Sequence, residues 1–295
     1  MKEIKKVNKN SILKKIFIKI CRFFNLEIID QNNFYLPVTK QYLNEDLSIP
    51  GKRSLTLPMG NVQITRKVKS LTIILRTCSS VHMLTQTKKR IFEKNKSEYT
   101  LRSLNSLIRS INHNKNIFDN INLDLIIVDH NSTQDVIDKM KLLLSKQFFK
   151  HQIIPLNLDN FIKDINPINE KKEKVTLNQM SNMSNIYQSL LLSKKCDDLV
   201  YFVEDDYIHS IESMKEMILT YEKLSSILKN ELILCPTDYP YLYTNTNDST
   251  IFLGDKKHWR TIKETLCTFL TSKIIIDKYW EKFDKWCKFE HYPFE

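Results

Sequence analysis

Two periodicities of apolar residues alternate along the chain from residue 70 onward. Short apolar runs rich in β-branched residues predict buried strands, and apolar residues that recur every three or four positions predict helices. The expected strands are 70–75, 123–128, 152–156, 199–203 and 232–235, with one or two further short strands beyond residue 250. The expected helices are 99–111, 135–144, 180–195, 213–229 and one near 272–286. This alternation favours an α/β fold with a mostly parallel central sheet flanked by helices.

Residues 11–24 are predicted to form an N-terminal helix that is apolar on one face and basic elsewhere. Lys14, Lys15, Lys19 and Arg22 stand between its isoleucine, leucine and phenylalanine residues. Such a helix either lies on an anionic membrane surface or docks on the folded body with its lysines in water. It has neither the ~18 uninterrupted apolar residues of a membrane span nor the cleavage site of a signal peptide.

The chain is expected to divide into three parts. Residues 1–30 hold the basic amphipathic helix. Residues 31–68 contain three prolines and two glycines with little periodicity, which is typical of a linker with short extended pieces. The alternating strands and helices fill residues 69–295, which we expect to form one sizeable domain.

Composition narrows the function classes. With 3 glycines in the chain, neither the G-x-G-x-x-G nor the G-x-x-x-x-G-K-[ST] phosphate-binding loop can be written. Residues 1–22 hold eight basic residues and one acid, so they carry +7 of the formal charge of +11. The remainder carries only +4, and we expect no nucleic-acid partner. The 6 cysteines lie far apart without metal-ligand spacing, which favours a cytoplasmic protein. If the helix in residues 1–24 binds an anionic membrane surface, the protein would be peripheral at the inner face of the membrane.

Three consecutive carboxylates follow the expected strand 199–203. Glu204, Asp205 and Asp206 would repel one another there, and a bound divalent cation would relieve that repulsion. Mg²⁺ or Mn²⁺ fits, because such ions are held by one or two carboxylates together with substrate phosphates. Glu204 and Asp206 would face the same way, while Asp205 would point elsewhere or orient its neighbours. The alternative is an acidic segment before the helix at 213–229, favoured by the helix dipole.

Polar residues also follow two other expected strands. Asp129 ends the run 123–128 and would bind a nucleotide base or ribose, or simply cap the next turn. Arg76 and Thr77 follow the run 70–75, where Arg76 would meet a diphosphate or base, or pair with a carboxylate at the rim. Ligands of open α/β sheets bind beyond the carboxyl ends of the strands, so these are the positions at which chemistry is expected.

Taken in their order along the chain, from Arg76 through Asp129 to Glu204, these three signals resemble the GT-A glycosyltransferases. The resemblance is in particular to the family-2-like group that uses nucleotide-diphosphate sugars. In that group a strand with a polar end, here LTIILRTCSS, precedes a helix with repeated Leu and Ser, here 101–107. A second strand then ends in a V-D-x-x-S-T-like motif, here 128–133. A helix with asparagines, here Asn182 and Asn185, leads to a strand that ends in a D-x-D-like motif, here 204–206. The resemblance covers about residues 69–210.

The resemblance implies an enzyme that moves a sugar from a nucleotide-diphosphate donor to a glycan or lipid-linked acceptor, as in polysaccharide biosynthesis. Residues 69–210 would bind the nucleotide sugar and residues 211–295 the acceptor. Asp129 would bind the base or ribose, with Arg76, Thr77 and Asp205 also at the nucleotide. Glu204 and Asp206 would hold Mn²⁺ or Mg²⁺, with Asp206 as the preferred direct ligand.

An inverting enzyme of this kind needs a carboxylate general base near the acceptor hydroxyl. Asp238, after the strand 232–235, and Glu264 both qualify by location, and Glu264 is slightly preferred. As alternatives, Asp238 would form a turn before Pro240, and Glu264 would form an ion pair with Lys263 or Arg260.

A polar and aromatic cluster at 258–260 adds further candidates. His258 would be a third metal ligand, Arg260 would hold the diphosphate, and Trp259 would stack on a sugar ring, unless it is an ordinary core residue. Tyr239 suits an acceptor cleft, and equally a plain half-buried strand.

Two other classes compete with this interpretation. A metal-dependent nucleotidyltransferase also places carboxylates at strand ends, but it would normally show a glycine-rich loop after its first strand, and residues 75–81 contain no glycine. A non-catalytic carbohydrate-binding or scaffold protein with the same fold is the second. The sequence leaves open the donor sugar and nucleotide, the acceptor, the choice between inversion and retention, and the oligomeric state.

Overall fold

The chain divides into two compact units, Met1–Asn61 and Val62–Glu295. Its structure, a computed structural model, describes residues 12–24, 26, 43–45, 53–55, 62–80, 95–237, 249–263 and 267–289. Among the helices in these ranges, none has the length and apolar content needed to cross a membrane.

The first unit contains the expected N-terminal helix, α1 (Ile12–Phe23), which has no acidic residue. It also contains β1 (Leu43–Glu45) and β2 (Arg53–Leu55), which pair antiparallel. Both strands lie within the segment 31–68.

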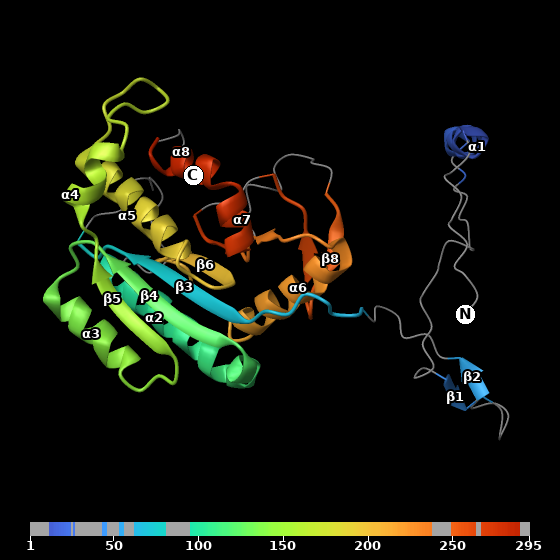
Figure 1. Cartoon of the computed structure of the whole chain (residues 1–295), viewed down its shortest axis with the longest axis horizontal. Helices are drawn as coiled ribbons and strands as arrows, with labels where there is room; N and C mark the ends of the chain where they lie inside the picture. Colours follow the sequence, from blue (N-terminus) through green and yellow to red (C-terminus); the bar gives the residue numbers. More distant parts are fainter. Residues whose placement is uncertain are drawn as a thin grey trace. The chain divides into compact units, whose positions relative to one another are not determined.

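The second unit is built on one sheet with the strand order β5-β4-β3-β6-β10-β7 (Figure 1). β5, β4, β3 and β6 are parallel, and β10 runs antiparallel between β6 and β7. The strands of this sheet are β3 (Ser70–Thr77), β4 (Asn122–Asp129), β5 (Lys150–Pro155), β6 (Leu199–Glu204), β7 (Ile233–Leu234) and β10 (Phe269–Ser272). The predicted α/β fold with a mainly parallel central sheet flanked by helices is thereby confirmed.

Helices cover both faces of this sheet (Figure 1). One face packs against α2 (Lys96–His113), α3 (Gln134–Leu144) and α6 (Ser213–Leu228). The other packs against α5 (Leu177–Ser193), α7 (Lys273–Lys278) and α8 (Trp280–Cys287). The remaining elements are η3 (Lys115–Asn120), α4 (Leu158–Phe161), η4 (Ile162–Asp164), and the antiparallel pair β8 (Ile251–Leu253) and β9 (His258–Arg260).

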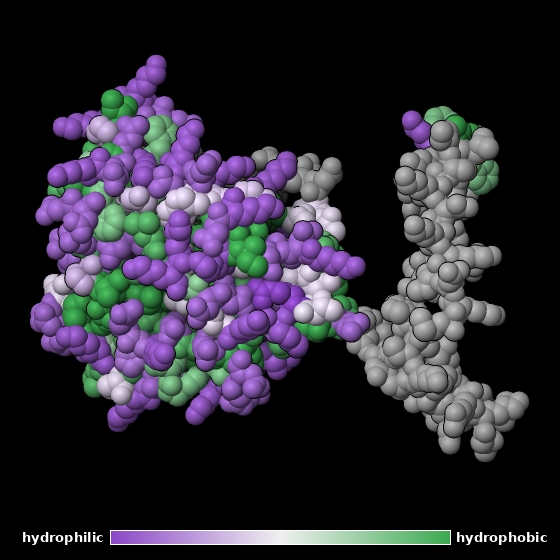
Figure 2. All heavy atoms as spheres, viewed as in Figure 1, coloured by the Kyte–Doolittle hydropathy of each residue, from purple (hydrophilic) through white to green (hydrophobic). Residues whose placement is uncertain are grey.

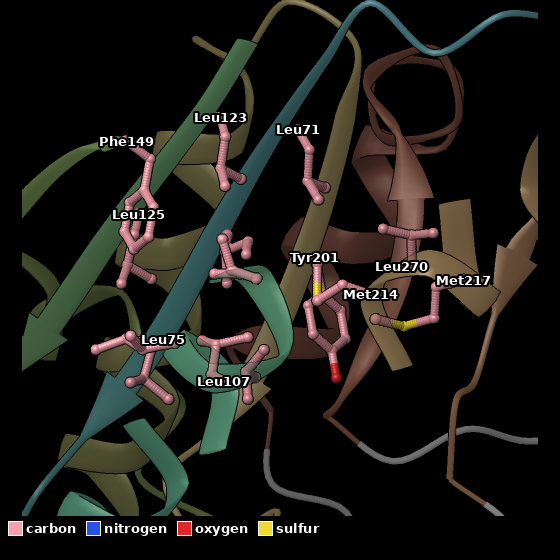
Figure 3. Packing of buried hydrophobic residues seen from close by; sticks show 14 of the residues in the cluster. Leu71, Leu75, Leu107, Leu123, Leu125, Phe149, Tyr201, Met214, Met217 and Leu270 are labelled. Carbon is pink, nitrogen blue, oxygen red and sulfur yellow. The ribbon is translucent and has the colours of Figure 1, made fainter. Parts of the chain in front are cut away.

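The core divides into two layers because successive strand residues point to opposite faces. Leu71 and Leu75 of β3 lie in the layer that also contains Leu107 of α2, Tyr201 of β6 and Met214 of α6 (Figure 3). Ile74 of β3 points into the layer on the α5 side. The visible surface of this unit is mostly hydrophilic, with separate hydrophobic areas (Figure 2).

Some elements differ from those that the sequence predicts. The helix expected at 272–286 is divided at Tyr279 into α7 and α8. β10 is a central, fully buried strand of the sheet, whereas the sequence predicts only one or two short strands in this region.

The second unit begins at Val62, before the expected domain start at residue 69, and the segment in between is bound to α6 and to the residues that precede β6 and β7. The Thr65 and Arg66 backbone N–H groups donate to Ser226 Oγ at 3.0 and 2.9 Å. The Arg66 guanidinium is ion-paired with Asp198 at 2.5 Å and with Glu231 at 2.7 Å. We call residues 62–69 the N-terminal strap.

Candidate functional site

The polar ends of three neighbouring strands meet at one edge of the sheet. In the parallel register Thr77 of β3 lies opposite Asp129 of β4, and Arg76 of β3 lies opposite Glu204 of β6. The sequence therefore places four of its candidate residues side by side through strand pairing alone. We call this group, together with Asp205 and Asp206, the sheet-edge cluster.

Arg76 is the centre of the sheet-edge cluster. Its side chain is 6% exposed and donates to Glu204 Oε1 at 2.9 Å and to Asn182 Oδ1 of α5 at 3.1 Å. Burial alone would lower the pKa of Arg76, but Glu204 and Asp205 outweigh that effect and raise it, so the guanidinium stays charged. The structure shows Arg76 paired with a rim carboxylate, and its contact with a diphosphate or base stays a prediction.

Glu204 is held in a partly desolvated position at this edge. Its side chain is 31% exposed, yet desolvation against the sheet raises its pKa. The positive charge of Arg76 lowers this pKa, and repulsion by Asp206 and Asp205 raises it again. Positive charge near Glu204 and Asp206 would therefore be favourable.

Asp205 turns away from its two neighbours and into the protein. One oxygen accepts from Lys96 Nζ at 2.5 Å, and the other accepts from Thr100 Oγ1 at 2.7 Å and from the Cys78 backbone N–H at 3.2 Å. It thus ties the start of α2 and the loop after β3 to the end of β6. This geometry supports the orienting role for Asp205 over direct contact with a nucleotide. The sequence alone does not identify Lys96 as a site residue, because nothing in the local pattern distinguishes it from the other lysines around it.

Asp129 organises the loops after β3 and β4. Its carboxylate accepts from Thr77 Oγ1 at 2.6 Å and from the Ser132 backbone N–H at 3.1 Å, and the turn between passes through Asn131 with φ 56°. The capping role is thus present, and Thr77 is its partner. Among the described residues, the nearby Ser79 hydroxyl is buried and has no hydrogen-bond partner.

The side chains at this edge provide only some of the ligands that a divalent cation needs. Within the described ranges, no group of three or more His, Cys, Asp or Glu side chains is arranged to hold a metal ion. Glu204 and Asp206 are adjacent carboxylates that repel each other, and this fits an ion that takes its other ligands from water and phosphate. His258 does not complete a three-ligand group with them, since it lies in β9, exposed, beside α6.

A cleft of about 970 Å³ lies between α6, β7 and the β8–β9 pair. Its walls are largely apolar, from residues such as Met217, Leu232 and Phe252, and His258, Trp259 and Arg260 line the β9 side. All of these residues belong to the half predicted to bind the acceptor.

The β8–β9 pair is fixed on α6 by one carboxylate. Glu216 accepts from Trp259 Nε1 at 2.9 Å and from the Lys256 and Lys257 backbone N–H groups at 2.8 and 3.2 Å. Trp259 is partly buried and packs against the core, as the alternative interpretation of this residue expects. The sequence alone does not identify Glu216 as a structural anchor, since its partners lie about forty residues away along the chain.

The remaining predicted residues, Asp238, Tyr239 and Glu264, lie outside the described residues. Asp238 directly follows Thr237, which lines the cleft, and Glu264 follows the last described residue after β9. Both remain predictions.

No protein-family model matches the sequence, and no curated protein matches it. Among solved structures, the chain is similar to the crystal structure of S. aureus TarS 1-349, with a TM-score of 0.38 and 12% sequence identity. The similarity covers 71% of this chain and 48% of that chain, so this chain spans about half the length of the TarS chain. Function is therefore inferred from the side chains of this chain.

Proposed function

We propose that this chain is a metal-dependent glycosyltransferase that moves a sugar from a nucleotide-diphosphate donor to a glycan or lipid-linked acceptor. The observation that carries the proposal is the convergence of Arg76, Asp129 and Glu204 through the register of three parallel strands. Open α/β sheets bind ligands at this edge. The separate cleft beside α6 supplies space for a second substrate, which a transferase requires.

The donor would bind across the sheet-edge cluster. Asp129 and Thr77 would offer hydrogen-bonding groups to the nucleoside end, with Ser79 two residues further along the same loop. Glu204 and Asp206 would hold Mn²⁺ or Mg²⁺, which when bound neutralises the diphosphate as it leaves. Arg76 would act by holding Glu204 in place, through the hydrogen bond between them. Asp205 would act by holding the loop after β3, through the hydrogen bond that it accepts from the Cys78 backbone N–H.

The acceptor would lie in the cleft beside α6. Arg260 and Trp259 line this cleft and suit an anionic or sugar-bearing acceptor. Transfer with inversion forms a bond between the acceptor oxygen and the anomeric carbon as the bond from that carbon to the diphosphate breaks. The bonding electron pair leaves with the diphosphate, and the hydroxyl proton passes to a carboxylate, for which Asp238 and Glu264 are the candidates.

Purified protein would be tested with a panel of nucleotide sugars in the presence and absence of Mn²⁺ or Mg²⁺. We expect metal-dependent release of a nucleoside diphosphate, and calorimetry should show nucleoside-diphosphate binding only with metal. Asp206→Asn should abolish both signals. Asp138→Asn is the matched control, since it removes the same charge from an exposed position on α3.

Each negative outcome has a distinct meaning. Binding of a nucleoside diphosphate without turnover of any donor would favour a non-catalytic protein. Release of pyrophosphate from nucleoside triphosphates would favour a nucleotidyltransferase. Retained metal-dependent binding in Asp206→Asn would contradict the assignment of the metal site.

A further inference from the structure

Helix α1 (Ile12–Phe23) carries a row of large hydrophobic side chains that the described part of its own unit leaves exposed. Ile16 and Ile20 are each 51% exposed, Phe17 is 58% exposed and Phe23 is 83% exposed. Phe24, directly after the helix, is also exposed. In Figure 2 the coloured atoms of α1 are mainly green, the hydrophobic end of the scale. Exposed apolar surface of this extent typically marks an interaction site.

The exposed residues share one face of the helix. Ile16, Ile20 and Phe23 follow one another at intervals of four and three, and Phe17 and Phe24 are separated by seven, so all five lie within one stripe. An isolated helix of 12 residues is marginal in water, because its few hydrogen bonds barely offset the loss of chain entropy. Burial of this stripe against another phase would therefore stabilise the helix itself.

The charged residues of α1 indicate which kind of surface its apolar stripe binds. The helix contains four basic positions, 14, 15, 19 and 22, and no acidic residue, and helical geometry puts these positions outside the apolar stripe. A basic polar face favours contact with anionic headgroups, because each lysine or arginine is attracted to the negative surface potential. An uncharged apolar partner would gain nothing from these bases.

We propose that α1 binds the surface of an anionic lipid bilayer and lies in its plane. The apolar stripe enters the boundary between headgroups and acyl chains, and the basic positions face the lipid phosphates. This inference concerns the first unit alone and does not rest on the proposed glycosyl transfer.

The test is co-sedimentation of the full chain with vesicles of phosphatidylcholine that contain a minority of phosphatidylglycerol. We expect binding to these vesicles, weaker binding to pure phosphatidylcholine, and a decrease in binding as salt is raised. Phe17→Glu and Ile20→Glu should each lower the partition coefficient by about tenfold to a hundredfold, because one large apolar side chain no longer enters the lipid.

Leu142→Glu provides the matched control. Leu142 is 73% exposed on α3, so this change also removes an exposed leucine and adds one negative charge, but in the second unit. Binding of Leu142→Glu should equal that of the wild type. Nucleoside-diphosphate binding should be the same in all four proteins, which separates this test from that of the proposed function.

Two results would overturn the inference. One is equal vesicle binding by the wild type, Phe17→Glu and Ile20→Glu. The other is a wild-type chain that does not bind phosphatidylglycerol vesicles and sediments as a dimer that Ile20→Glu dissociates, which would assign the stripe to a second copy of the chain.

Discussion

Gly254 lies where the surrounding atoms leave no room for a side chain. A Cβ atom built on it would overlap Thr220 Oγ1 and Glu216 Oε1 and would come within 2.6 Å of Trp259 Cδ1. Gly254 is the one glycine in the sequence after residue 60, and on that ground the sequence predicts a close approach of the backbone to a ligand there. The approach found here is to α6 and to β9 of the same chain.

Replacement of this glycine should therefore destabilise the protein. We expect Gly254→Ala to lower the free energy of unfolding by about 1–3 kcal/mol, the usual cost of an overpacked contact. Glu216 cannot easily move aside, because Trp259 and two backbone N–H groups hold it. Urea unfolding measures the loss, and Lys257→Ala, an exposed change in the same hairpin, should alter stability by less than ~0.5 kcal/mol. Equal stability of the two variants would contradict the packing at Gly254.

Glu231 links stability to pH. Burial alone would raise its pKa, but hydrogen bonds from Arg66 and Tyr221 outweigh burial and lower the pKa from 4.5 to about 2. The contribution of Glu231 to stability is thus fully present above pH 4.5, the value for the unfolded chain, and is lost as the pH falls towards 2.

The expected size of this effect is roughly 2 kcal/mol lost between about pH 6 and about pH 3. Urea unfolding at both values should show a steeper loss for the wild type than for Glu231→Gln, which has no proton to gain. Glu98→Gln, in an exposed ion pair with Arg102, should behave like the wild type. Parallel losses in the wild type and Glu231→Gln would refute the assignment.

At the scale of elements, α5 has the clearest start signal. Thr176 and Gln179 form a capping box: the Gln179 backbone N–H donates to the Thr176 hydroxyl, and the Gln179 side chain accepts from the Thr176 backbone N–H. The position of α5 matters to the site, because Asn182 bonds Arg76 and Asn185 donates to the Val128 carbonyl.

Removal of this cap should cost more than removal of a similar threonine elsewhere. We expect Thr176→Ala to lower the free energy of unfolding by about 1 kcal/mol. Thr133 begins α3 but accepts no capping hydrogen bond from the described backbone of that helix, so Thr133→Ala should cost less than ~0.5 kcal/mol. Thermal or urea unfolding of the two variants checks the difference, and a larger loss for Thr133→Ala would count against it.

Periodicity predicted the elements whose signal is local. The strands at 70–75, 123–128 and 199–203 and the amphipathic helices α2, α3, α5 and α6 appear where apolar spacing places them. β10 gave little signal, since it is four residues long and its burial results from its position between β6 and β7. Tyr279, where α7 ends and α8 begins, lies within a single helical pattern of apolar residues.

The candidate site shows the same division. Strand ends predicted Arg76, Asp129 and Glu204, because parallel register brings such ends together. The sequence does not predict the partners Lys96 and Glu216, because an ion pair or hydrogen bond between distant segments produces no periodic pattern in the sequence.

At the scale of the molecule, the N-terminal strap defines where the second unit can be cut. A chain that begins at Val62 should unfold at the same urea concentration as the second unit of the full chain. A chain that begins at Lys69 loses Arg66 and leaves Asp198 and Glu231 without their cation, and should be less stable by roughly 2–4 kcal/mol. Equal stability of the two shortened chains would show that the strap is dispensable.

The position of β10 also has a consequence for the order in which the protein is made. β6 pairs with β3 on one side, but its other edge is covered only by β10, which leaves the ribosome well after β6. Until then the apolar strand Leu199–Glu204 presents an open edge, the kind of surface from which aggregation starts. Premature termination before residue 269 should therefore yield an insoluble product, and a nascent chain stalled in this interval would be a natural client for a chaperone.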